Sequence, residues 1–209
     1  MSATTTGYRT IRVTPASPAV GAVVSGVDLR DLDDEQFDEI RRAFREPGVV
    51  FLRDQDITPD EHVEFARRWG EINVNRFFTP VDTHPMIAEV RKEPDQRINV
   101  GGVWHTDHSY DQIPARGSVL VAREVPPVGG DALFSSMYAA YDALSDGMKE
   151  TLLGLEAEHS SRHVFGRQQP GSVRDDARAE LFSNPDHATQ DAVHPVVIEH
   201  PLSGRPRST

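Results

Sequence analysis

The sequence predicts an α+β fold in which a sheet sandwich or barrel is accompanied by helices. Three observations predict it: short apolar runs of strand type recur along the chain, well-capped helical patterns interrupt them, and the connections are irregular. Strands and helices that do not alternate regularly are typical of a layered α+β domain. The runs expected to form strands are residues 8–13, 20–27, 49–52, 118–124 and 194–198.

Helix starts are marked by side chains that can cap them. Asp33 or Asp34 precedes an apolar pattern of helical spacing that ends at Pro47-Gly48. Thr58 and Glu61 form the pattern of a capping box with proline at the first helical position, and Trp69 is expected in the core behind that helix. Further helices are expected after Ser135 or Ser136 and after Ser145, and a hairpin-type turn at residues 201–204.

Length and composition limit the classes of function. The 209 residues suit a single domain over residues 1–209, without internal repeats. A formal net charge of −11 argues against nucleic acid or an anionic membrane surface as the main partner, which leaves a small molecule as the expected partner. The absence of cysteine excludes disulfides, thiolate metal sites and cysteine nucleophiles. The N-terminus lacks the pattern of a signal peptide and no apolar run reaches membrane-span length, so a cytoplasmic location is expected.

The central stretch is Trp104-His-Thr-Asp-His-Ser-Tyr110, which contains a His-x-Asp pair. If it forms a strand, the side chains of His105 and Asp107 point to the same face, because successive residues alternate. A histidine and a carboxylate completed by a distant second histidine form the facial triad of non-haem iron oxygenases. The alternative is an ordinary polar pair on a strand. His62 and Glu64 have the same spacing by chance, on a predicted helix where residues two apart point away from each other.

Two irregular regions carry less information. Residues 73–102 are interrupted by three prolines and a glycine pair, so they suit a binding loop or lid, and a plain surface loop equally well. Residues 167–178 are rich in glutamine, arginine and aspartate, which indicates an exposed loop or a poorly packed helix.

Several motifs in a fixed order resemble one family. They are Trp104-His-Thr-Asp107, Pro126-Pro-Val-Gly-Gly-Asp-Ala-Leu-Phe134 and Ala139-Ala-Tyr-Asp-Ala-Leu-Ser145, supported by residues 21–29, 49–55, 65–71, 194–197 and 201–205. Together they resemble the Fe(II)- and 2-oxoglutarate-dependent dioxygenases of the taurine dioxygenase (TauD/TfdA) family. The resemblance covers nearly the whole chain. It implies a double-stranded β-helix, the jelly roll of the clavaminate-synthase type, with flanking helices.

The resemblance also implies a chemistry. His105 and Asp107 match the first two iron ligands of the family. Such an enzyme takes Fe(II) as its metal and 2-oxoglutarate and dioxygen as co-substrates, and it hydroxylates a small organic substrate such as a sulfonate, a sulfate ester or an aryloxyalkanoate. Family members commonly form homo-oligomers. A hydrolytic zinc site on the same pair is a competing hypothesis, but no clear third ligand or general base accompanies it.

The sequence departs from the family at the co-substrate and substrate positions. Ala132 stands where members often carry a threonine whose hydroxyl bonds 2-oxoglutarate, so that hydrogen bond must be absent or replaced. Asn75, Phe78 and Gly101 stand where the taurine enzyme has His, Tyr and Asn, and His108 replaces a smaller apolar residue. A pocket without those donors is not expected to hold taurine; a larger or more apolar substrate is expected instead. His108 contacts the substrate or points to the opposite face.

The last departure concerns the C-terminal end. In the family, the second iron histidine and the arginine that binds 2-oxoglutarate follow the strand that His194-Pro-Val-Val197 matches, whereas this sequence ends at Thr209. None of the later histidines matches the missing motif. The expectation is therefore the N-terminal two-thirds of an oxygenase domain, with a jelly roll incomplete at its C-terminus. The alternative is a catalytically inactive remnant, or an interaction module of the same fold.

Overall fold

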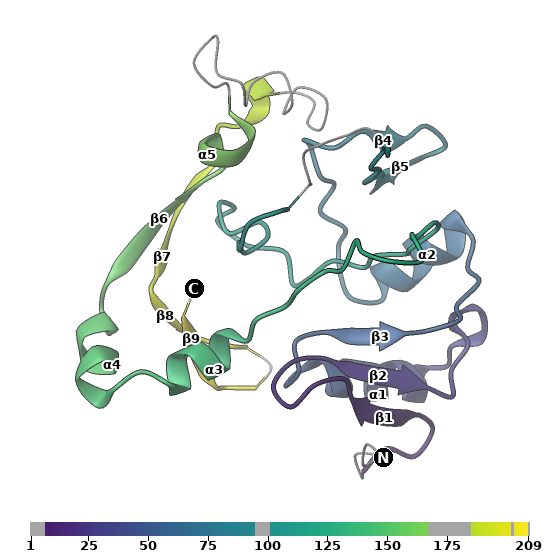
Figure 1. Ribbon diagram of the computed structural model, residues 1–209, viewed down its shortest axis with the longest axis horizontal. Helices are drawn as coiled ribbons and strands as arrows, with labels where there is room; N and C mark the ends of the chain where they lie inside the picture. Colours follow the sequence, from purple (N-terminus) through teal and green to yellow (C-terminus); the bar gives the residue numbers. More distant parts are fainter. Residues whose placement is uncertain (1–6, 95–100, 167–184, 202, 209) are drawn as a thin grey trace. The chain divides into compact units, whose positions relative to one another are not determined.

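The computed structural model describes residues 7–94, 101–166, 185–201 and 203–208. The chain divides into two compact units (Figure 1). Unit 1 comprises Met1–Glu61, Val121–Leu155 and Pro195–Thr209, and unit 2 comprises His62–Leu120 and Glu156–His194. Both mix short strands with short helices, which confirms the mixed character of the predicted fold. Of the helices in the described ranges, none is long and apolar enough to cross a membrane.

A three-stranded sheet forms the first part of unit 1. Its strands β1 (Arg12–Pro15), β2 (Ala22–Ser25) and β3 (Val50–Leu52) follow the order β1-β2-β3. β1 is antiparallel to β2, and β2 pairs in parallel with β3, which requires the long connection that lies between them. The strand predicted at residues 8–13 therefore begins and ends later in the chain, while those at 20–27 and 49–52 are confirmed.

Helix α1 (Asp34–Phe44) packs against β2 and supplies much of the core of unit 1 (Figure 1). It begins at a capping box: the Asp33 carboxylate accepts from the backbone N–H of Gln36 at 2.7 Å, and the Gln36 side chain accepts from the N–H of Asp33 at 3.3 Å. Ile40 is fully buried and Phe37 nearly so. The predicted helix is confirmed, with Asp33 as its cap.

Glu39 is a buried carboxylate on α1 that holds the segment before β1. It accepts hydrogen bonds from the backbone N–H groups of Arg9, Thr10 and Ile11 at 2.8–3.2 Å and from the Thr10 hydroxyl. Burial alone would raise the pKa of the Glu39 carboxyl, but these hydrogen bonds together outweigh it and lower the pKa to about 2. The Glu39 carboxylate thus attaches the backbone of residues 9–11 to α1 through charge-assisted hydrogen bonds.

Unit 1 also contains a 3-10 turn, two short helices and a hairpin, and both helices follow their predicted caps. η1 (Leu29–Asp31) is a single 3-10 turn, and α3 (Met137–Asp142) and α4 (Asp146–Leu152) are capped by Ser136 and Ser145. β8 (Val197–Glu199) and β9 (Pro206–Ser208) form an antiparallel hairpin, and α3 packs against β9. The hairpin around residues 201–204 is confirmed. The strand predicted at residues 194–198 is divided between β7 and β8.

Helix α2 (Pro59–Arg67) begins in unit 1 and continues into unit 2. Thr58 and Glu61 form the predicted capping box: the Thr58 N–H donates to the Glu61 carboxylate at 2.7 Å, and the Glu61 N–H donates to the Thr58 hydroxyl at 3.3 Å. Behind the helix, the half-buried Trp69 meets the buried Phe65 edge to face, with ring centroids 6.2 Å apart.

Unit 2 is built from two short strand pairs and an aromatic cluster. β4 (Pro80–Val81) pairs with β5 (His84–Ala88), so the irregular region at 73–102 contains a hairpin. β6 (Glu156–Ser160) pairs with β7 (Asp191–Pro195); α5 (Arg162–Phe165) follows β6 and η2 (Pro185–His187) precedes β7. Phe77 is fully buried, stacks on Phe165 at 4.0 Å and meets Tyr110 edge to face.

One predicted strand is wrong. Residues 118–124 carry no strand in the described chain, and Leu120 is 81% exposed. An apolar run becomes a strand only when a neighbouring strand supplies ladder hydrogen bonds, and the described residues supply none here. The predicted loop at residues 167–178 lies outside the described residues.

Candidate metal centre

The predicted ligands His105 and Asp107 lie close together, but the backbone that carries them has a different conformation from the one expected. Residues 104–106 are irregular and a turn covers residues 107–110, so the predicted strand here is wrong. His108 has a φ of 55°, a left-handed conformation that ends any extended run. The His105 Nε2 atom is nevertheless 3.2 Å from the Asp107 Oδ1 atom. The turn, rather than strand alternation, brings the imidazole and the carboxylate to one place.

The imidazole of His105 is oriented by its other nitrogen. Nδ1 lies 2.8 Å from the backbone oxygen of Val103. A carbonyl oxygen only accepts, so Nδ1 carries the proton, and in the neutral ring Nε2 presents its lone pair. This is the arrangement by which a second contact prepares a histidine to bind a metal.

The pair could share a cation. The Nε2 lone pair and an Asp107 oxygen lie 3.2 Å apart and can both be donated to one ion. The side chains are 48% and 67% exposed, which leaves the site open to small molecules. Within the described residues, no group of three or more His, Cys, Asp or Glu side chains is placed to hold a metal. The described chain thus brings together one imidazole and one carboxylate, side-chain types that can bind a divalent metal.

Gly101, predicted as a substrate residue, lies directly beside the His105 ring. It has a φ of 67°, and a Cβ atom placed on it would be 3.2 Å from the His105 Cε1 atom. That separation is tighter than ordinary contact. Gly101 therefore keeps open the space next to the edge of the ring that carries Nε2.

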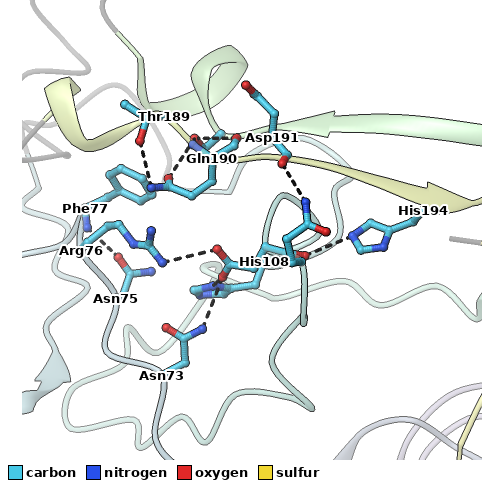
Figure 2. A network of polar contacts seen from close by, with 12 residues as sticks. Asn73, Asn75, Arg76, Phe77, His108, Thr189, Gln190, Asp191 and His194 are labelled. Carbon is cyan, nitrogen blue, oxygen red and sulfur yellow. Dashed lines mark hydrogen bonds and ion pairs between the residues drawn. The ribbon is translucent and has the colours of Figure 1, made fainter.

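His108 belongs to a polar network in unit 2 (Figure 2). Its Nδ1 atom is 3.0 Å from the Asp111 Oδ2 atom, and its side chain is only 13% exposed. Its ring lies tilted over Tyr110 at 5.5 Å. The partly buried ring and its carboxylate partner account for this side chain structurally; its contact with substrate stays a prediction.

Asn75 and Phe78 lie in the loop that reaches this network. The Asn75 side-chain oxygen accepts from the backbone N–H groups of Phe77 at 2.9 Å and Phe78 at 3.2 Å, so it shapes the loop locally. Phe78 is half-buried. Their neighbour Arg76 reaches the Asp111 carboxylate, which joins this loop to the turn that follows Asp107. The structure thereby brings three of the predicted substrate residues, including His108, into one region of unit 2.

Ala132, predicted at the co-substrate position, belongs to unit 1. It follows Gly129 and Gly130, whose φ angles of 83° and 74° fit the predicted change of chain direction. Its methyl group offers no hydrogen-bond donor. Its role in binding 2-oxoglutarate stays a prediction.

Asp111 and His194 were not predicted as parts of this site. Asp111 accepts from His108, Arg76 and Asn73, and the His194 Nε2 atom donates to backbone oxygens in the same turn. Asp111 shares no recognised motif with Asp107. His194 lies 83 residues from Asp111, so only the fold brings them together.

The mixed α/β chain and its histidine–carboxylate pair fit a known class, the 2-oxoglutarate-dependent dioxygenases. Residues 12–208 match the family model described as taurine catabolism dioxygenase TauD, TfdA family. The chain belongs to the TauD/TfdA family, which confirms the resemblance found in its motifs.

Relatives with described activities agree. The (S)-phenoxypropionate/alpha-ketoglutarate-dioxygenase of Sphingobium herbicidovorans is 32% identical over 198 residues, covering 92% of this chain and 68% of that protein. Pentalenolactone F synthase of Streptomyces avermitilis is 34% identical over 203 residues, covering 90% and 66%. The alpha-ketoglutarate-dependent 2,4-dichlorophenoxyacetate dioxygenase of Cupriavidus pinatubonensis is 35% identical over 174 residues, covering 73% and 60%. The chain spans 60–68% of the length of these relatives.

Solved structures extend the likeness to the fold. A taurine dioxygenase from Burkholderia xenovorans superposes with a TM-score of 0.67 at 28% identity, covering 96% of this chain and 62% of that one. The structure of AAD-2 in complex with Mn(II) and N-oxalylglycine superposes with a TM-score of 0.64 at 27% identity, covering 95% and 68%. The fold is therefore of the kind found in TauD-type dioxygenases.

Proposed function

We propose that the protein acts as an Fe(II)- and 2-oxoglutarate-dependent dioxygenase on a small organic acid, with a jelly-roll core. The observation that carries the proposal is the pairing of His105 Nε2 with Asp107 Oδ1, with His105 held in the metal-binding tautomer by Val103. Family membership supports the reaction class.

The residues of the site have distinct tasks in this proposal. His105 contributes a neutral nitrogen and Asp107 a negative charge, which together suit a divalent metal and leave coordination positions open. Iron bound there would supply the oxidative chemistry of the reaction. In that reaction 2-oxoglutarate and dioxygen are converted to succinate and carbon dioxide, and the substrate is hydroxylated. The family resemblance implies a further histidine ligand and an arginine for 2-oxoglutarate. Ala132 takes the threonine position without its hydroxyl, so backbone or water must replace that bond.

Among the candidate substrate classes, aryloxyalkanoates are favoured over sulfonates and sulfate esters. Four relatives that are 30–35% identical carry names that specify phenoxypropionate or 2,4-dichlorophenoxyacetate, whereas two relatives at 32% and 28% are named for sulfonates. The predicted pocket positions point the same way: Phe78 offers an aromatic surface, and Gly101 leaves space beside His105. Phe78 and Gly101 carry no side-chain donor for a small sulfonate, so taurine is not the proposed substrate. A cytoplasmic location and self-association remain predictions from the sequence and the family resemblance.

A substrate panel tests the proposal. Succinate formation from 2-oxoglutarate is measured with Fe(II) and oxygen in the presence of a phenoxypropionate, an alkyl sulfonate, an alkyl sulfate ester or taurine. We expect stimulation by the aryloxyalkanoate and none by taurine. Stimulation by the sulfonate or sulfate ester alone would contradict the proposed substrate class but would still support the proposed reaction. If no compound stimulates succinate formation and the protein binds no divalent metal, the inactive-remnant alternative replaces the proposal.

A further inference from the structure

The turn that carries Asp107 is held from two sides within unit 2 (Figure 2). It runs from Asp107 to Asp111, and the backbone N–H of Asp111 closes it by donating to the His108 oxygen at 3.0 Å. Asp107 itself points into solvent, with 67% of its side chain exposed. Its own surroundings therefore restrict it little, and its position depends on what holds the turn.

The first group that holds the turn is the Asp111 carboxylate. It accepts from His108 Nδ1 at 3.0 Å, from Asn73 Nδ2 at 3.3 Å and from an Arg76 guanidinium nitrogen at 3.4 Å. Its side chain is only 13% exposed, so these contacts are sheltered from water. One carboxylate thus ties the last residue of the turn to the loop at residues 73–76.

The second group that holds the turn is His194, near the end of β7 in the same unit. Its Nε2 atom lies 2.9 Å from the Ser109 oxygen and 3.1 Å from the Asp111 oxygen, so one N–H serves two carbonyl groups of the turn. Gln112, just beyond the turn, adds a bond from its side-chain nitrogen to the Asp191 oxygen at 3.2 Å. The turn and the residue after it are therefore attached to β7 at two positions, Asp191 and His194.

The backbone of the turn needs such support. His108 adopts a φ of 55°, which is unfavourable for a residue with a side chain and persists only where surrounding contacts enforce it. The His108 side chain is hydrogen-bonded to the Asp111 carboxylate. Of the next two residues, Ser109 is bound through its backbone oxygen to His194, and Tyr110 is held by the burial of its ring. The strained residue directly follows Asp107, so release of the turn would move the carboxylate.

We propose that Asp111 and His194 are positioning residues that keep the Asp107 carboxylate beside the His105 imidazole. The inference rests on the proposed function, because it concerns the same metal pair. Neither side chain is assigned to the metal. Each acts by fixing the backbone that presents Asp107, which fits the general finding that the groups behind metal ligands strongly affect metal affinity.

Titration with Mn(II) tests this proposal, followed through the broadening of the His105 ring signals in NMR spectra. We expect His194→Leu to weaken Mn(II) binding on the order of 10- to 100-fold, because the two bonds to the turn are lost. His194→Gln, whose amide restores a donor, should recover part of the affinity. The matched control is His62→Leu, which removes another imidazole bound through Nε2 to a backbone oxygen, that of Val119 at 3.0 Å, and should bind Mn(II) as the parent does.

A second variant guards against a folding failure in His194→Leu. Asp111→Asn keeps the shape of the side chain but lacks its charge and one acceptor. It should weaken Mn(II) binding by a similar factor. Its melting temperature should stay well above the temperature at which the titration is run, which shows that the variant is folded. Unchanged Mn(II) affinity in His194→Leu or in Asp111→Asn, with His105 still broadened, would overturn the positioning role and leave the metal pair standing. If Mn(II) fails to broaden His105 in the parent protein, the metal pair itself is wrong and the inference falls with it.

Discussion

The Nδ1 atom of His105 lies 2.8 Å from the backbone oxygen of Val103, and this contact assigns the free lone pair to Nε2. Nε2 is also the atom that faces Asp107. A backbone group two residues away thus leaves the Nε2 lone pair available beside Asp107, independently of any strand geometry.

Replacing Asp107 by asparagine should weaken divalent metal binding at least 10-fold. The amide keeps an oxygen near His105 Nε2 but supplies no negative charge, and hard or borderline divalent metals depend on that charge. Calorimetric titration with Mn(II) measures the effect. Asp82→Asn, an exposed change in the same unit, is the control and should leave the affinity unaltered. Equal affinities in the two variants would remove Asp107 from the site.

Replacing Gly101 by alanine should lower both stability and metal affinity. The positive φ of 67° costs about 1–2 kcal/mol for a residue with a Cβ, and that Cβ would press on the His105 ring at 3.2 Å. Gly48→Ala is a matched control, because Gly48 has the same φ of 67° with no atom within 4 Å of the added Cβ. We expect similar shifts in melting temperature, but a fall in Mn(II) affinity only for Gly101→Ala. Loss of affinity in both variants would show that backbone strain alone is responsible.

Replacing Glu39 by glutamine should destabilise unit 1 by about 2 kcal/mol, because a buried charged acceptor of several N–H groups is lost. Denaturant unfolding, followed at neutral pH, measures the change. Glu35→Gln, an exposed substitution on the same helix, is the control and should cost less than about 0.5 kcal/mol.

The same carboxylate predicts a pH dependence. The pKa of Glu39 is lowered from 4.5 to about 2 in the folded protein. A lowered carboxyl pKa stabilises the folded state fully above the unfolded pKa, and this contribution is lost as the pH falls from about 4.5 towards 2. Between those values the stability of the parent should fall more steeply than that of Glu39→Gln. Parallel curves for the two proteins would contradict the assignment.

Local chemistry made several elements predictable from the sequence. Asp33, Ser136 and Ser145 cap helices as expected, because a cap is decided by a side chain and the backbone two or three residues away. The hairpin of β8 and β9 likewise forms around its predicted turn. For the same reason His105 and Asp107, two residues apart, were found from the sequence and lie together in the fold.

Features that depend on distant partners were not predictable. Residues 118–124 have the composition of a strand but no ladder partner among the described residues, whereas the polar β6 forms because β7 pairs with it. The strand expected around His105 is replaced by a turn stabilised by Asp111 and His194. Contacts over such separations follow from the fold, so no local pattern marked them.

The most direct test of the central claim is succinate formation by His105→Ala compared with His62→Ala. Both variants remove a histidine that is followed two residues later by a carboxylate, but only His105 belongs to the candidate metal centre. With Fe(II), 2-oxoglutarate and the best compound of the substrate panel, we predict that His105→Ala abolishes substrate-stimulated succinate formation and His62→Ala retains it. Unchanged succinate formation in His105→Ala would contradict the assignment of His105 to the metal.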